Sequence, residues 1–222
     1  MYFQFLIEDR STEVLVGHVM RKIQEKYSDS DIYYDVKSFK GLGHLSTKGT
    51  LMERKSGNLL NDLRLYLRGF DKSLADMENA SIVIVLDNDE RDHEIFKNEL
   101  ENVARDIVQS VDYAFCIAVK EMEAWLLGDR NAVMNAYPMA REKILDAYKQ
   151  DGICDTWEVL ANAIYPGGLS GLKKKSKNSY TEIGKAKSEW ADKIGDKLTL
   201  ENNISPSFQN FIGSLEYRIE RA

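Results

Sequence analysis

Short apolar runs and longer amphipathic segments alternate through the first half of the chain. Four short runs rich in β-forming residues predict strands at 2–8, 32–39, 81–87 and 113–119. The last two runs are almost wholly apolar, which is typical of strands that are covered on both faces, as in a parallel sheet. The pattern therefore predicts a sheet with a buried centre.

Amphipathic segments follow the first three strands and predict the helices that connect them, at 11–26, 57–77 and 91–110. Ser11 or Thr12 is expected to cap the first of these helices. Repeated strand–helix alternation predicts an α/β fold with a doubly wound, mostly parallel four-stranded sheet. Right-handed crossovers would place helices on both faces of that sheet.

The second half of the chain changes character and is predicted to be helical, apart from a Gly-, Lys- and Ser-rich stretch at 166–180 that is expected to be flexible. We expect residues 1–128 to form the α/β domain and residues 129–222 to form a helical C-terminal extension packed on it. The segments predicted to be helical are 121–149, 155–164, 184–195 and 206–220.

Composition narrows the class of protein. Of 222 residues, 43% are hydrophobic and 30% are charged, which is the balance of a globular protein. No apolar run approaches the roughly 18 residues that a membrane span needs. Cys116 and Cys154 have no CxxC spacing, so zinc and a disulfide framework are unsupported and a reducing cytoplasm is expected. The net charge of −6 argues against a protein that coats nucleic acid, but it allows an enzyme that meets phosphates through metal ions.

Acidic residues stand where predicted strands end. Glu8 ends the first strand, and Asp87 and Asp89 form a DxD at the end of the third. An extended exit would point Asp87 and Asp89 the same way, and neighbouring strands lie about 4.8 Å apart, so Glu8 would reach the same ion if its strand were adjacent. Crowded carboxylates favour a cation, and Mg²⁺ (or Mn²⁺) suits oxygen donors. The alternative is that such acids only cap the following helices.

The pattern of an acid after the first strand and a DxD after the third resembles the TOPRIM superfamily. The detail is similar to an uncharacterised bacterial domain family in the TOPRIM group, related to the TOPRIM domains of OLD-type nucleases. The similarity spans most of the chain, and the stretch EMEAWLLGD is its most specific part. It rests chiefly on residues 7–9, 85–89 and 118–129.

This resemblance implies a TOPRIM-like fold, magnesium-dependent nuclease activity on a nucleic acid, and an ABC-type or OLD-like ATPase partner in antiphage defence. Within it, Glu8 would be a metal ligand or general acid/base, and Asp87 and Asp89 would be metal ligands. Nuclease relatives use a lysine to stabilise developing charge, and Lys120 stands in a suitable place for this catalytic role. Strand passage of the topoisomerase kind is not expected, because nothing indicates a domain with a nucleophilic tyrosine.

Two further groups of charged residues follow. Glu121 and Glu123 would point about 200° apart on a helix, so one is expected to face the site. Glu123 is a candidate second-metal or supporting group, or else a helix-start charge. A lysine-rich patch is a candidate contact for a nucleic-acid backbone, or else a solvated loop. The patch comprises Lys173, Lys174, Lys175, Lys185 and Lys187, the last two expected at a helix start.

Two other classes of function remain open from the sequence. A receiver-like domain would accept a phosphoryl group on Asp87, although the DxD and the long helical extension are unusual for that class. A non-catalytic TOPRIM-like subunit would keep the acidic site for binding or regulation only.

Overall fold

A four-stranded, all-parallel sheet lies at the centre of the computed structural model, which describes residues 1–45 and 57–222. The strand order is β2-β1-β3-β4, so β1 and β3 are adjacent at the centre and β4 is an edge strand. The α/β class and the parallel sheet are thereby confirmed. The strands are β1 (Tyr2–Ile7), β2 (Tyr33–Ser38), β3 (Ala80–Asp87) and β4 (Asp112–Ala118).

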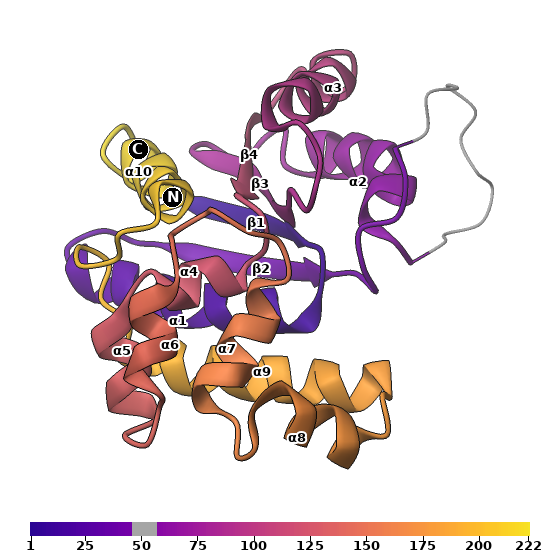
Figure 1. The fold of residues 1–222 in the computed structure, drawn as a ribbon. Helices are drawn as coiled ribbons and strands as arrows, with labels where there is room; N and C mark the ends of the chain where they lie inside the picture. Colours follow the sequence, from indigo (N-terminus) through magenta and orange to yellow (C-terminus); the bar gives the residue numbers. More distant parts are fainter. Residues whose placement is uncertain (46–56) are drawn as a thin grey trace.

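Helices cover both faces of the sheet (Figure 1). One face carries α2 and α3, and the other carries α1 together with helices of the second half. None of the helices in the described ranges is long and apolar enough to cross a membrane. The helices are α1 (Arg10–Lys26), α2 (Leu59–Ser73), α3 (His93–Arg105), α4 (Glu123–Leu127), α5 (Arg130–Ala136), α6 (Glu142–Ala147), α7 (Thr156–Ile164), α8 (Gly168–Ser176), α9 (Tyr180–Lys197) and α10 (Pro206–Ile219).

Burial on both faces explains why the central strands are continuously apolar. Along β3, Val83 and Val85 enter the core beneath α1, whereas Ile82 and Ile84 enter the core beneath α2 and α3. Successive side chains of a strand point to opposite faces, so a strand with two cores needs apolar residues at every position.

The segment predicted to be flexible is helical over most of its length, because composition was outweighed by burial. Within α8, Leu172 and Ser176 are buried, while Lys174 and Lys175 stay exposed. The helix that follows starts at Tyr180, four residues earlier than expected. Lys185 and Lys187 therefore lie inside α9 and not at its start.

The stretch EMEAWLLGD ties the sheet to the C-terminal helices. The Trp125 ring stacks on Phe211 of α10 with centroids 5.2 Å apart. Gly128 is required by close packing, since a Cβ there would lie 2.1 Å from the Asn203 side-chain oxygen. The Asp129 carboxylate accepts hydrogen bonds from Ala132 N at 2.9 Å and Thr199 N at 3.0 Å. Asp129 caps α5, so the long helix predicted over 121–149 is interrupted here between α4 and α5, and it is interrupted again between α5 and α6.

Candidate functional site

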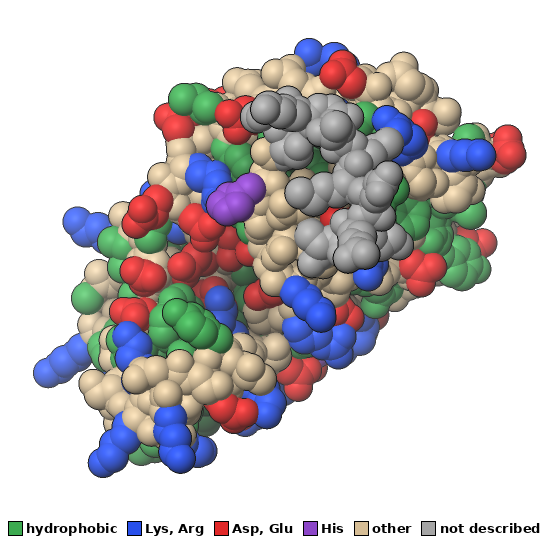
Figure 2. Space-filling model, turned by 90° about the vertical axis from the view of Figure 1, so that its right-hand side faces the viewer, with side chains coloured by type: hydrophobic (Ala, Val, Ile, Leu, Met, Phe, Trp, Pro, Cys, Tyr) green, Lys and Arg blue, Asp and Glu red, His purple; other side chains and the backbone are tan. Residues whose placement is uncertain are grey.

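Two carboxylates meet where β1 and β3 end. The Asp87 backbone N–H donates to Glu8 Oε2 at 3.0 Å, and the Met122 N–H donates to Asp87 Oδ1 at 2.9 Å. The second oxygens, Glu8 Oε1 and Asp87 Oδ2, accept no hydrogen bond from the described residues. Figure 2 shows acidic side chains gathered in a hollow of this face. The adjacency of β1 and β3 thus brings together the two acids that the sequence singled out.

Asp9 adds a third carboxylate beside them. Its Oδ1 accepts from Thr12 N and its Oδ2 accepts from the Ser11 hydroxyl, both at 2.8 Å. Asp9 is therefore the cap of α1, and the expectation that Ser11 or Thr12 caps this helix was wrong. The reason is that α1 starts at Arg10, so Ser11 and Thr12 already lie in its first turn.

A buried ion pair completes the group. Glu123 is fully buried, and Lys187 Nζ, on a side chain that is 21% exposed, lies 3.1 Å from its Oε1. The contact is close but poorly aligned, because neither Glu123 oxygen has a hydrogen-bond donor of favourable geometry among the described residues. Lys187 thus reaches inward from α9 to the acids, whereas the sequence made it a candidate contact for a nucleic-acid backbone.

Burial raises the pKa of each of the three acids of this group. Burial, with smaller effects of Asp9 and Asp89, raises the pKa of Glu8 to about 7, against the opposing hydrogen bond from the Asp87 N–H. Burial and then the Glu8 charge raise the pKa of Asp87 well above its usual range. Burial also raises the pKa of Glu123. A cation at this place would favour all the ionised carboxylates together.

The Lys187 ammonium responds in the opposite direction. Burial alone would lower its pKa, but the combined attraction of Glu123, Asp87 and Asp9 outweighs this effect and raises the pKa. Lys187 therefore stays charged and compensates only part of the negative charge around it.

Asp89 does not share the Asp87 position as an extended exit would require. The backbone of Asp89 is left-handed, with φ of 51°, and its N–H donates to the Lys120 carbonyl at 2.8 Å. Its carboxylate, on a residue whose side chain is 47% exposed, accepts from Arg91 at 2.8 Å. The chain turns directly after β3, so the two aspartates point differently, although Asp89 still lies near enough to raise the pKa of Glu8.

The interactions of Lys120 and Glu121 are with residues outside the acidic group. Lys120 has a left-handed backbone, with φ of 71°, and its charge acts on the Cys154 thiol. Glu121 caps α7, because its carboxylate accepts from the Thr156 hydroxyl at 2.8 Å and from Trp157 N at 3.2 Å. Glu121 lies before α4, which begins at Glu123, so the two residues do not share one helix as predicted, and only Glu123 joins the acidic group.

The other lysines of the predicted patch make only surface contacts. Lys173 pairs with Glu158 at 2.8 Å and lies over the Trp157 ring, and Lys185 pairs with Glu182 at 2.6 Å. Lys187 is the member of the patch that joins the acidic group. Its sequence signal was its place on the buried stripe of α9, which continues with Trp190, Ala191 and Ile194.

The donors fit magnesium better than a transition metal. In the described ranges, no three His, Cys, Asp or Glu side chains are already arranged as a metal-binding group. Mg²⁺ needs only one or two protein carboxylates and keeps several waters, which matches Glu8 and Asp87 with their free oxygens. No family model matches the chain, and neither a curated protein nor a solved structure matches it.

Proposed function

We propose that this protein is a TOPRIM-like nuclease that hydrolyses phosphodiester bonds with Mg²⁺ (or Mn²⁺). The observation that carries the proposal is the meeting of Glu8 and Asp87 at the carboxyl ends of adjacent central strands. In open parallel sheets this edge is where ligands bind. Burial is the largest cause of the raised pKa of both acids, and a bound cation would favour their ionised forms.

Glu8 and Asp87 would hold the ion, and the bound ion would supply an activated water and offset charge on the phosphodiester. Glu8 Oε1 is free either to bind the ion or to hold a proton near neutral pH. Lys187 neutralises Glu123, which leaves the negative charge of Glu8 and Asp87 for the ion. The two carboxylates of Glu8 and Asp87 thus set the charge that the site offers to the ion.

Asp89 and Arg91 would act at the rim. Arg91 pairs with Asp89 Oδ2, and its guanidinium would also suit a phosphate of the substrate. The exposed Lys174 and Lys175 are candidates for weaker backbone contacts farther away. The acidic net charge means that affinity for nucleic acid would depend on the metal.

The partner follows from the resemblance alone. An ABC-type or OLD-like ATPase would regulate the nuclease in a defence system. The alternative role, a binding subunit without turnover, predicts that the folded protein binds Mg²⁺ and cuts nothing.

The experiment is cleavage of plasmid DNA, single-stranded DNA and tRNA by purified protein with Mg²⁺, Mn²⁺ or EDTA. Glu8→Gln and Asp87→Asn should each abolish cutting, because each removes one ligand charge. Asp92→Asn is the matched control: Asp92 caps α3 through Ile95 N, and asparagine caps as well as aspartate.

Metal-dependent cutting that is lost in both site variants and kept in the control would support the nuclease. Cutting that persists in EDTA or in both variants would refute this site. Mg²⁺ binding without cutting would favour the binding subunit. Phosphorylation of Asp87 by a small phosphodonor would favour the receiver-like alternative.

A further inference from the structure

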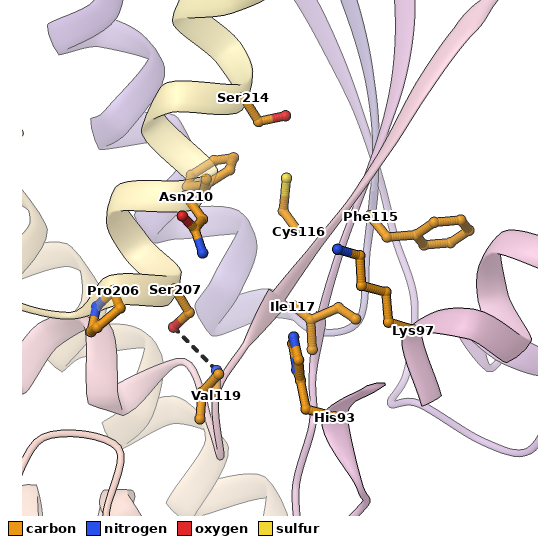
Figure 3. Close-up of a pocket in the computed structure, with 11 residues that line it drawn as sticks. His93, Lys97, Phe115, Cys116, Ile117, Val119, Pro206, Ser207, Asn210 and Ser214 are labelled. Carbon is orange, nitrogen blue, oxygen red and sulfur yellow. Dashed lines mark hydrogen bonds between the residues drawn. The ribbon is translucent and has the colours of Figure 1, made fainter. Parts of the chain in front are cut away.

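A second pocket lies on the edge of the sheet, apart from the acidic residues. It has a volume of about 410 Å³ and lies between α3, β4 and α10. None of the residues that line it belongs to the group around Glu8 and Asp87. Figure 3 shows β4 passing between a wall from α3 and a wall from α10. The residues that line the pocket include His93, Lys97, Phe115, Ile117 and Ser207.

The pocket exposes hydrogen-bonding groups of the β4 backbone. The Asn88 N–H donates to the Ala118 carbonyl at 3.0 Å, so the backbone groups of Ala118 face β3. Backbone groups of successive residues in a parallel strand point to alternate sides. The N–H and C=O groups of Phe115 and Ile117 therefore point away from the sheet, into the pocket.

Both ends of this edge are already closed by α10. Arg218 donates to the Tyr113 carbonyl at 2.9 Å, and Val119 N donates to the Ser207 hydroxyl at 3.2 Å. Between these two contacts, no described residue pairs with the outward groups of Phe115 and Ile117. These two residues lie roughly 7 Å apart at about 3.3 Å per residue, so about three residues of an added strand would pair with both.

The pocket is suited to a negative charge. Lys97 reaches from α3 toward β4 (Figure 3) and makes no ion pair within the described part of the chain. The His93 Nδ1 atom is buried and has no hydrogen-bond partner there. The residues that line the pocket include no Asp or Glu. A carboxylate in this pocket would meet a cation and no competing acid.

We propose that this edge of β4 binds the C-terminal end of a partner polypeptide as a short added strand. Main-chain hydrogen bonds to Phe115 and Ile117 would hold the strand, and Lys97 would bind its terminal carboxylate. The end of a polypeptide fits this edge better than a segment from the middle of one. The reason is that Arg218 and Ser207 already bind the backbone of β4 on either side of Phe115 and Ile117. The proposal does not depend on the metal site.

The test uses a pool of fluorescent pentapeptides with β-branched residues at alternate positions and a free C-terminal carboxylate. Binding is measured by anisotropy in EDTA, and protection of the Phe115 and Ile117 amides is measured by hydrogen exchange. We expect members of the pool to bind and to protect both amides. C-terminal amidation should weaken binding about tenfold, because it removes a charge-assisted hydrogen bond.

Lys97→Met should weaken the free-acid peptides by the same factor and leave the amidated peptides unchanged, whereas Lys174→Met, at another exposed lysine, should have no effect. Methylation of alternate peptide amides should abolish binding. Asp87→Asn should bind normally, which separates this site from the nuclease. The proposal would be overturned if no peptide bound at millimolar concentration, or if methylation of the peptide amides had no effect on binding. It would also be overturned if an amidated peptide with a side-chain carboxylate bound as tightly as the free-acid peptides.

Discussion

The Lys187 ammonium shares a buried space with several carboxylates, and the charge balance there depends on this one side chain. Among the residues that the structure describes, Glu123 forms an ion pair with Lys187 alone, and neither of its oxygens has a hydrogen-bond donor. Removal of one partner from a buried pair leaves an uncompensated charge, which costs more than the pair itself contributes.

Lys187→Met should therefore lower the free energy of unfolding by about 3–5 kcal/mol at neutral pH, as urea denaturation would measure. Combining Lys187→Met with Glu123→Gln should restore part of this loss, because the Glu123 charge is then removed together with its partner. Lys185→Met, which removes only an exposed pair with Glu182, should change the free energy by less than about 1 kcal/mol. A loss as large in the control would contradict the assignment.

The raised pKa of Glu8 predicts how stability depends on pH without divalent metal. The folded protein keeps a proton on Glu8 up to about pH 7, whereas the unfolded chain releases it near 4.5. The unfolding free energy should therefore fall as pH rises between these two values and level off above them. Asp87 and Glu123 shift in the same direction.

Urea midpoints in EDTA across this pH range would measure the effect. Glu8→Gln should flatten the dependence, since it removes the titrating group and keeps an oxygen for the Asp87 N–H. Stability that rises with pH in the wild-type protein would contradict the direction of the shift.

At the scale of elements, α7 depends on a cap from another part of the chain. Its own preceding residue, Asp155, has a left-handed backbone and makes no capping hydrogen bond from its side chain. The Glu121 carboxylate supplies these contacts from the end of β4. The start of α7 is thus held to the sheet edge.

Glu121→Ala should destabilise the protein by about 1–2 kcal/mol and increase amide exchange in the first turn of α7. Glu121→Gln should destabilise the protein less than Glu121→Ala, because one acceptor oxygen remains. Glu182→Ala, which removes the exposed pair with Lys185 on α9, is the control and should leave exchange in the first turn of α7 unchanged.

The sequence predicted the strands and the first helices well, because burial on both faces leaves a continuous apolar pattern. It failed where long-range contacts decide local structure. The composition of residues 166–180 indicated a loop, but residues 168–176 form a helix in which Leu172 is buried. The left-handed turn at Asp89 redirected a carboxylate that spacing alone placed beside Asp87. Lys187 was grouped with the candidate nucleic-acid contacts, because its buried partner Glu123 lies far away in the sequence and meets it only in the folded chain.

At the scale of the whole molecule, metal binding should stabilise the folded state. Mg²⁺ at about one hundred times its dissociation constant would add about 2.7 kcal/mol, because the unfolded chain lacks the site. Thermal unfolding with Mg²⁺ and with EDTA would measure this gain. Asp87→Asn should abolish the gain, and Asp92→Asn should keep it. An equal gain in both variants would place the metal elsewhere.

The position of Lys187 in the chain has a consequence for biosynthesis. Glu8, Asp87 and Glu123 leave the ribosome well before α9, and a domain generally folds as a unit. Until α9 is made, the nascent sheet edge holds acids with no internal counter-ion, so the acidic cluster reaches its final charge only in a nearly finished polypeptide. A prematurely terminated product that lacks α9 would therefore carry an unbalanced, unstable site and be a ready target for quality control.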